Sequence, residues 1–552
     1  MTFSKYHSFS RIFYVYSIMR NFFKKNSETY VPIEKANVDN ITSRIIGDFG
    51  RWQLKISILM SLIKLPMAWY QLNIIFMAPP QQFWCAKPPA FEKYTDEEWR
   101  KISVPVIMEY PCLIFDPDIL LIAPKMDRHI IPLVACQKFV YDKTFFKRTL
   151  TSDFGLVCTK RWYINMSQCV MMTGIVVGGL VFGSIADKYG RKKPLMLAIV
   201  IQATGSYLVS FAPYYWTFLV VWFILAFGCG GIAIISFVIC MEVVSGRWRT
   251  YIPVVYQLPF GLGNVVLALL SYWLRDWRKI EFALATVSLI YLLYWFWLPE
   301  SPRWLLAVGK YDEAVEVFKK IVLENKRDVG DIRAIVALLP KKKKNDKLHL
   351  QFSDLMKSKN MRRKTIILSL IWFFTGLSYF TFSQYLGLIG SSIFLLVSMS
   401  GIISIPGGLL CLFILAKLGR KTTLNLFQIL ATVCFFAIYI FPKEDAKKAG
   451  IRLFFAGLGF AAIAGTVPAL YLYTGELFPT VGRNVGVGGV TTFARIASMI
   501  APLLVHLDVY IPGLPLLLVI FISAGQIFLV FPLPETRNKP IPDSLEEAEQ
   551  FR

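Results

Sequence analysis

The sequence predicts an all-α membrane protein with about twelve transmembrane helices in two six-helix halves. Of its 552 residues, 55% are hydrophobic, and the mean hydropathy is +0.51. The apolar residues form blocks of about 20 with few charges, the length that crosses a bilayer core of about 30 Å. A basic turn between two of these blocks recurs in a weaker form in the second half of the chain. This recurrence indicates two related halves.

The expected spans show no polar face, which indicates helices embedded in lipid rather than the amphipathic helices of a soluble protein. We place them at residues 53–77, 164–186, 194–211, 216–243, 251–274, 282–298, 365–386, 393–416, 424–441, 451–473, 485–506 and 513–531. The chain then divides into a tail (1–50), a first bundle (51–299) with an extracellular loop at 78–163, a helical linker (300–363), a second bundle (364–532) and a final tail (533–552). Within the linker, residues 311–323 have the period of an amphipathic helix.

The formal charge of +24 does not indicate a nucleic-acid partner, because of where the basic residues lie. They cluster in the first tail, at 188–193, through the linker, and at Arg420 and Lys421, and all these segments fall on one side of the membrane. The positive-inside rule makes that side cytoplasmic. No cleavable signal peptide is evident, so the first span is expected to act as the signal. The sequence thus predicts a multi-pass plasma-membrane protein with both termini cytoplasmic and with basic segments that contact the lipid bilayer.

The expected extracellular loop contains four cysteines, Cys85, Cys112, Cys136 and Cys158, while the other five lie inside spans. This distribution is typical of two disulfides in an oxidising compartment. Four cysteines allow three connectivities, and the sequence leaves the pairing open. A zinc site is the rival interpretation, but there is no Cys-x-x-Cys spacing and His129 is the only histidine of the loop.

The basic turn after the second span reads Gly183-x-x-x-Asp187-x-x-Gly190-Arg191-Lys192-Lys193, and its echo reads Gly419-Arg420-Lys421. Glycines allow two helices to approach and the chain to reverse direction. Asp187 can pair with Arg191 or accept hydrogen bonds from the N-terminus of a neighbouring helix. We therefore expect a tight cytoplasmic turn in each half.

Three further motifs follow the sixth, tenth and twelfth spans. They are Pro299-Glu300-Ser301-Pro302-Arg303, Glu476-Leu477-Phe478-Pro479-Thr480-Val481-Gly482-Arg483, and Leu533-Pro534-Glu535-Thr536-Arg537. In the first motif a proline ends the span, and Glu300 and Arg303 are free to pair near the inner surface.

Together with the cysteine-bearing loop, the order of these motifs resembles the organic cation, organic anion and carnitine transporter family of the major facilitator superfamily. The resemblance covers residues 50–549. It implies the major facilitator fold and alternating access, in which two helical bundles rock around a midplane site. It also implies an inner gate held by charge pairs from the turns. The expected gate residues are Gly183, Asp187, Gly190, Arg191, Glu242, Arg249, Glu300, Arg303, Arg420, Glu476 and Arg483.

Arg495 is the most informative polar residue inside a span, because charged side chains are expensive there and usually face a cavity. It lies seven residues before Pro502 in the eleventh span. In the family that the chain resembles, this position tends to be arginine in carriers of anions and carnitine, and acidic in carriers of cations. A guanidinium fork matches a carboxylate, so a carboxylate-bearing substrate is the leading hypothesis. A snorkelling arginine is the alternative.

The eighth span departs from the family pattern on both sides of Pro406. Relatives often have an acid two residues before this proline, and anion carriers have a lysine two residues after it. Here these positions are Ser404 and Gly408. The missing acid counts against a simple cation and the missing lysine against a strongly anionic drug-like substrate, so a monocarboxylate or a carnitine-like zwitterion fits best.

Aromatic and amide side chains are expected to complete the cavity. They are Tyr70 and Asn73, with Gln71, on the first span, Gln257 and Asn264 on the fifth, and Tyr379, Phe380 and Tyr385 on the seventh. Aromatic faces can hold a quaternary or protonated amine by cation–π attraction of about 0.5–2 kcal/mol each. Lys64, in the middle of the first span, is a further candidate.

Three other functions stay open at this point. They are an organic cation carrier, a sugar or polyol carrier with the same turn motifs, and a sensor that binds such ligands without moving them. An enzyme is disfavoured, because His7, His129, His349 and His506 form no metal-ligand cluster or catalytic triad in the sequence. The chain has no Gly-Lys-Ser/Thr phosphate loop, and no cofactor is expected. The expected partners are a small organic ion and the bilayer.

Overall fold

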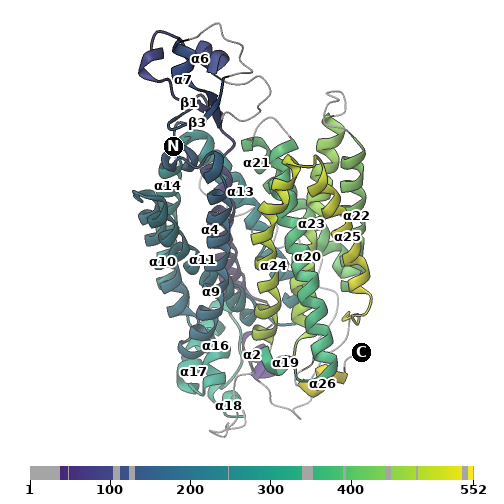
Figure 1. Cartoon of the computed structure of the whole chain (residues 1–552). Helices are drawn as coiled ribbons and strands as arrows, with labels where there is room; N and C mark the ends of the chain where they lie inside the picture. Colours follow the sequence, from purple (N-terminus) through teal and green to yellow (C-terminus); the bar gives the residue numbers. More distant parts are fainter. Residues whose placement is uncertain are drawn as a thin grey trace, which may run out of the picture.

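A computed structural model describes residues 38–47, 49–103, 112–122, 131–246, 248–338, 352–389, 393–441, 449–479, 483–537, 542 and 545–550. Within these residues, nine helices are long and apolar enough to cross a membrane. The other three expected spans are also helical, but the first is interrupted, the third begins with two lysines and the twelfth has 17 residues. The helices form two groups that stand side by side (Figure 1).

The first group contains the six spans expected before the linker. The first span consists of α3 (Arg51–Leu62), α4 (Lys64–Leu72) and α5 (Ile74–Met77). It is followed by α9 (Trp162–Tyr189), α10 (Lys192–Ser210), α11 (Tyr215–Val243), α12 (Trp248–Val255), α13 (Leu258–Leu274), α14 (Trp277–Leu289), η3 (Ile290–Leu293) and α15 (Tyr294–Trp297). The fifth span is divided between α12 and α13, where Pro253 and Pro259 lie close together. Proline lacks an amide hydrogen and clashes with the preceding turn, which accounts for this break.

The second group contains the remaining six spans. They are α20 (Lys359–Ile389), α21 (Ile393–Leu418), α22 (Arg420–Ile440), α23 (Ala449–Leu477), α24 (Arg483–His506) and α25 (Leu514–Val530), with η5 (Leu507–Val509) between the last two. The two groups contact each other where α13 crosses α21. A side chain at Gly261 or at Gly401 would collide with the backbone of the opposite helix, so this crossing requires glycine on both sides.

The segment between the first two spans forms a small domain at one end of the bundle (Figure 1). Strand β1 (Phe83–Cys85) pairs with β4 (Phe139–Tyr141), and β2 (Leu113–Phe115) pairs with β3 (Leu133–Ala135), both antiparallel. The helices of this domain are η1 (Pro89–Phe91), α6 (Asp96–Ser103), α7 (Pro117–Ile122), α8 (Leu150–Phe154) and η2 (Cys158–Lys160). We call this end of the bundle the loop end.

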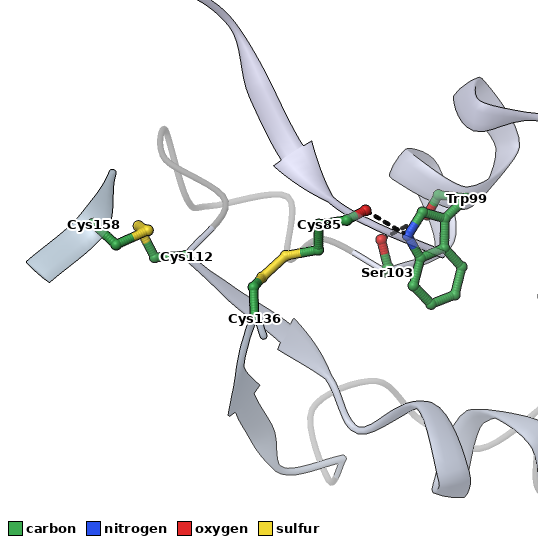
Figure 2. The surroundings of a disulfide bond; sticks show 6 residues. All are labelled: Cys85, Trp99, Ser103, Cys112, Cys136 and Cys158. Carbon is green, nitrogen blue, oxygen red and sulfur yellow. Dashed lines mark hydrogen bonds between the residues drawn. A yellow bond between two sulfur atoms is a disulfide. The ribbon is translucent and has the colours of Figure 1, made fainter. Parts of the chain in front are cut away.

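The loop-end domain contains the two disulfides predicted from the cysteine distribution. They join Cys85 to Cys136 and Cys112 to Cys158, which selects one of the three possible connectivities (Figure 2). The fully buried Trp99 packs beside the first disulfide and donates its indole N–H to the Cys85 carbonyl oxygen at 3.1 Å. The two cross-links and this side chain replace the large core that so small a domain lacks.

The opposite end of the bundle carries short helices, and we call it the linker end. These helices are α2 (Val38–Ile46), α16 (Pro302–Val308), α17 (Tyr311–Asn325), α18 (Ile332–Ala337), α19 (Phe352–Leu355) and α26 (Leu545–Gln550). The amphipathic helix expected at 311–323 is α17, whose apolar face is buried at Ala314, Val315, Phe318 and Ile321. In addition, Asn325 accepts a hydrogen bond from the Trp52 amide at 2.9 Å, which fixes α17 to the start of α3.

Candidate functional site

A charged cluster occupies the turn between α9 and α10 at the linker end. The Arg191 guanidinium donates to Glu242 at 3.0 and 3.2 Å and lies 3.1 Å from the Asp187 carboxylate. Glu300 accepts hydrogen bonds from the backbone amides of Arg191 and Lys192. Arg191 is only 6% exposed, so its charge depends on these carboxylates.

The second half contains an equivalent cluster between α21 and α22. The Arg420 guanidinium donates to Glu476 at 2.6 and 2.9 Å, and the Thr536 hydroxyl donates to the same carboxylate at 2.6 Å. Glu535 accepts from the amides of Arg420 and Lys421, each at 3.0 Å. Each half therefore uses one glutamate for the arginine side chain and another for the first amides of the following helix.

The glycine of each turn supplies a backbone conformation that other residues rarely adopt. Gly190 has φ +97° and Gly419 has φ +96°. A side chain at Gly190 would also collide with the Glu300 carboxylate. Glycine is therefore needed both for the left-handed conformation and for the close approach of the acid.

Other expected gate residues lie around these clusters. Arg303 donates to the carbonyl oxygen of Val244 at 3.3 Å and to the Ser245 hydroxyl at 3.1 Å. The predicted partner of Arg303 was Glu300, whose carboxylate instead binds the start of α10. At Gly183, an added Cβ would lie 3.9 Å from Ile234, which is an ordinary van der Waals distance. No close helix approach among the described residues therefore requires glycine at this position. The side chains of Arg249 and Arg483 lie outside the described residues, and their gating role stays a prediction.

A cavity of about 130 Å³ lies between the two helix groups. It is lined by Lys64, Gln71, Val254, Gln257, Leu258, Phe260, Gly261, Trp372, Thr375, Gly376, Tyr379, Phe380, Ser404, Gly408, Ala464, Val467, Pro468, Tyr471, Thr491, Ala494 and Arg495. Of the residues expected in the cavity, Arg495, Gln71, Gln257, Tyr379 and Phe380 are in this set, as is the further candidate Lys64. A mostly apolar, partly aromatic wall with a few polar groups is typical of a small-molecule site.

Both charged residues among the described lining residues are cations. Arg495 of α24 donates to the Gln71 side-chain oxygen of α4 at 3.0 Å, which joins the two halves through their side chains. Lys64 Nζ lies 4.5 Å from the centroid of the Tyr256 ring. Neither cation has a carboxylate partner among the described residues, and no Asp or Glu lines the cavity there. The cavity thus presents positive charge without a compensating acid.

Four residues expected in the cavity do not line it in the described part of the chain. Tyr70 and Asn73 point into the first half, where they hydrogen-bond with Ser288 and Glu281 respectively. Asn264 packs against Gly401 in the close crossing of α13 and α21. Tyr385 belongs to the hydrophobic core of the second half. The sequence indicated the depth of these side chains in their spans but not the direction in which they point.

Several residues of the candidate site were not singled out from the sequence. Trp372 and Tyr471 line the cavity together with Arg495. Trp372 lies seven residues before the predicted Tyr379, a spacing that places both on one helix face and could have identified it. Glu535 and Thr536 complete the second charged cluster, and their signal was the likeness of the Pro-Glu-Thr-Arg and Pro-Glu-Ser-Pro-Arg motifs. Within the described part of the chain, no group of three or more His, Cys, Asp or Glu residues could hold a metal ion.

Comparison with known proteins identifies the relatives of this chain. The family model described as "Sugar (and other) transporter" matches residues 132–548. The chain is 29% identical over 524 residues to the Organic cation transporter protein of Drosophila melanogaster, covering 92% of this chain and 93% of the relative. It is 30% identical over 521 residues to Solute carrier family 22 member 20 of Mus musculus, again covering 92% and 93%. It is 28% identical over 521 residues to Organic anion transporter 3 of Sus scrofa, covering 92% of each chain.

Solved structures show the same fold at much lower identity. The proton:xylose symporter XylE bound to 6-bromo-6-deoxy-D-glucose superposes with a TM-score of 0.61 at 15% identity, covering 90% of this chain and 98% of that one. The inward open conformation of the xylose transporter XylE from E. coli superposes with a TM-score of 0.56, also at 15% identity, covering 90% and 99%. The paired charged turns and the cavity between two six-helix groups fit this fold. The chain therefore is a multi-pass membrane protein that belongs to the organic cation and organic anion transporter family, solute carrier family 22, of the major facilitator superfamily.

Proposed function

We propose that this protein carries small organic anions across the plasma membrane by alternating access, and that a monocarboxylate or a carnitine-like zwitterion is its preferred substrate. The observation that carries the proposal is the pair of cations, Arg495 and Lys64, in a cavity with no acid among its described lining residues. An anionic substrate would compensate these charges, whereas a simple cation would be repelled.

The aromatic lining supports a substrate with an additional apolar or quaternary ammonium part. Trp372, Tyr379 and Phe380 come from α20, and Tyr471 comes from α23. A quaternary ammonium against such rings gains about 0.5–2 kcal/mol per ring. This attraction favours carnitine-like zwitterions as the second candidate, since their carboxylate can still bind Arg495. Both candidates agree with the relatives, whose names include organic cation and organic anion transporters.

Alternating access is supported by the position of Arg495 between the halves. Arg495 comes from the second half and binds Gln71 from the first, so a carboxylate at this guanidinium would compete with a contact that joins them. A carboxylate can accept two parallel hydrogen bonds from the guanidinium, whereas the Gln71 side-chain oxygen accepts one from it. Substrate binding would thus change the balance of contacts across the interface of the two halves.

Uptake measurements with Arg495→Ala test the proposal. Cells expressing the wild type or the variant take up labelled benzoate, carnitine, tetraethylammonium or glucose, with surface expression measured in parallel. Loss of a charge-assisted contact of about 1.5–3 kcal/mol lowers the affinity for benzoate or carnitine about 10- to 100-fold. Arg333→Ala, an exposed linker arginine, is the matched control and is expected to transport as the wild type does. Uptake of tetraethylammonium that Arg495→Ala leaves unchanged, without benzoate or carnitine uptake by the wild type, would overturn the anion assignment.

A further inference from the structure

A carboxylic acid, Glu281, is enclosed among helices of the first half, away from the charged clusters and the cavity. Glu281 of α14 is 0% exposed. Its Oε1 accepts a hydrogen bond from the Asn73 amide nitrogen, and its Oε2 accepts one from the Ser206 hydroxyl at 2.8 Å. Within the described residues it has no ion pair. A carboxylate enclosed in this way inside a membrane protein marks a functional candidate.

The groups that face Glu281 do not compensate a negative charge. The titratable groups near it include the phenol of Tyr70 on α4 and the thiol of Cys229 on α11. On α10, the helix packed most extensively against α14, Tyr207 hydrogen-bonds with Thr286. Arg278, one turn away on α14, is bound to Asp153 at 3.0 Å. Burial without a cationic partner favours the neutral carboxylic acid over the carboxylate.

We propose that Glu281 is a proton-binding site, reached from the extracellular side, that links substrate uptake to external pH. Glu281 lies five residues after Asp276, which precedes α14 at the loop end, so it sits about 7 Å below that end. A proton therefore has a short way to travel from the loop-end solution.

The surroundings are suited to a proton rather than to a metal ion. Asn73 and Ser206 both present donors to the carboxylate, and an N–H group repels a metal cation. In contrast, the buried Asn73 side-chain oxygen has no hydrogen-bond partner among the described residues. When a proton binds Glu281 Oε1, the carboxyl group becomes a hydrogen-bond donor at that atom. A half-turn of the Asn73 amide then presents its oxygen as the acceptor.

The second half shows that a buried polar junction of this kind does not need an acid. There, Gln526 of α25 donates to the Thr375 hydroxyl of α20 at 2.7 Å and also hydrogen-bonds with Gln428 of α22. These are the first, third and sixth spans of the second half, and Asn73, Ser206 and Glu281 come from the same three spans of the first half. Since amides hold the helices together in one half, the carboxyl group in the other half has a property that an amide lacks, which is titration.

The protonation of Glu281 is linked to the cavity through the first span. Asn73 lies directly after α4, and α4 also carries the cavity residues Lys64 and Gln71. A change in the hydrogen bond of Asn73 therefore acts on the helix that positions Gln71 against Arg495. Protonation also removes a negative charge from the low-dielectric interior, which favours an anion in the cavity. Only the direction of this effect rests on the proposed function; the proton site does not.

Two readouts with Glu281→Gln test the proposal. The amide imitates the neutral acid and cannot titrate, and Glu324→Gln, at an exposed carboxylate, is the matched control. In purified protein, infrared difference spectra across a pH titration are expected to show a buried protonated carboxyl group in the wild type and the control but not in Glu281→Gln. Benzoate uptake is expected to rise severalfold from about pH 8.5 to about pH 5.5 in the wild type and the control, and to be independent of pH in Glu281→Gln.

The outcomes separate this proposal from the proposed function. Identical infrared titrations of the wild type and Glu281→Gln would overturn the proton site, as would the same pH response of uptake in both. A wild type that takes up no benzoate contradicts the proposed function, while the infrared titration still decides on Glu281. If Glu281→Gln does not reach the membrane, Ser206→Ala is the second variant. It removes the donor that stabilises the charged carboxylate, and a titration that does not move to higher pH would overturn the proposal.

Discussion

The contact between Arg420 and Glu476 is expected to be one of the costliest to break at the linker end. Both side chains are nearly buried, at 12% and 13% exposed, and the guanidinium makes its closest contact with the carboxylate at 2.6 Å. In Arg420→Ala, the Thr536 hydroxyl is the one hydrogen-bond donor that the carboxylate keeps among the described residues. Hydrogen bonds to charged groups contribute about 1.5–3 kcal/mol each, and removing one member of a buried ion pair costs about 3–5 kcal/mol. We therefore expect Arg420→Ala to lower the free energy of unfolding by about 3–5 kcal/mol.

A double-mutant cycle measures this contribution. Purified wild type, Arg420→Ala, Glu476→Gln and the double variant are unfolded by denaturant in the same detergent, and their free energies of unfolding are compared. The double variant is expected to be more stable than the sum of the single effects predicts, by at least about 1 kcal/mol, because no charge is left without its partner.

The matched control is an exposed ion pair at the same end of the molecule. Lys55 and Glu324 lie 3.3 Å apart with side chains 46% and 37% exposed. Exposed pairs contribute about 0–1 kcal/mol, so Lys55→Ala should have little effect. An Arg420→Ala effect as small as that of Lys55→Ala, or strict additivity in the cycle, would refute the reasoning.

Three further predictions concern other parts of the molecule. Phe394 of α21 stacks with Phe76 and Phe146 at ring-centroid distances of 5.5 and 5.4 Å, and such aromatic pairs contribute about 0.5–1.5 kcal/mol each. We expect these stacked rings, which join the two halves, to restrict access to the cavity from the loop end. Phe394→Ala should then increase labelling of a cysteine placed at Gln71 by an impermeant thiol reagent, and unchanged labelling would exclude this restriction. The Cys112–Cys158 disulfide closes a loop of 46 residues and is expected to stabilise the loop-end domain by up to about 4 kcal/mol. Cys112→Ser should therefore make this domain more sensitive to protease. Equal protease resistance of the variant and the wild type would contradict the estimate from loop entropy. Desolvation alone would raise the pKa of Glu549, but hydrogen bonds from the Asn360 amide, the Ser358 hydroxyl and the Met361 amide outweigh it and hold this pKa below its ordinary value. The ionised carboxylate therefore favours docking of α26 at neutral pH, and docking weakens as the pH falls through the lowered pKa. Proteolysis of the tail should rise below about pH 4 in the wild type but not in Glu549→Gln.

The spans and the charged turns could be predicted because they depend on local properties of the sequence. A block of apolar residues is long enough to cross a membrane whatever its neighbours are, and a basic turn is fixed by the charge rule. Arg495 could be placed in the cavity for a similar reason, since a charge in an apolar helix has few other places to go. The pairing of Arg191 with Asp187 was also foreseeable, because only the short turn at Gly190 separates the two residues and keeps their side chains close.

The direction in which a side chain points could not be predicted where the helix is apolar on all sides. Lys64 and Gln71 are seven residues apart and share a face of the first span that lines the cavity, whereas Tyr70 and Asn73 lie on another face and contact the helices of the first half. Hydrophobic periodicity distinguishes the faces of a helix only when one of them is exposed to water. In this span the polar residues face either a cavity or a buried network, and the sequence pattern is the same for both.

The two charged clusters differ in one respect that predicts a difference in how strongly each arginine stabilises the fold. Arg191 contacts two carboxylates, Asp187 and Glu242, while Arg420 contacts Glu476, and the position equivalent to Asp187 is Ala416. Arg191→Ala removes a cation that contacts two acids, in contrast to one acid in Arg420→Ala, and like charges in proximity repel each other. We therefore expect Arg191→Ala to lower the free energy of unfolding by more than Arg420→Ala does, and Asp187→Ala to restore part of the loss in the double variant. An equal loss in both arginine variants, with no rescue by Asp187→Ala, would mean that Asp187 is held by contacts other than the arginine. The first half would then resemble the second in its energetics as well as in its geometry.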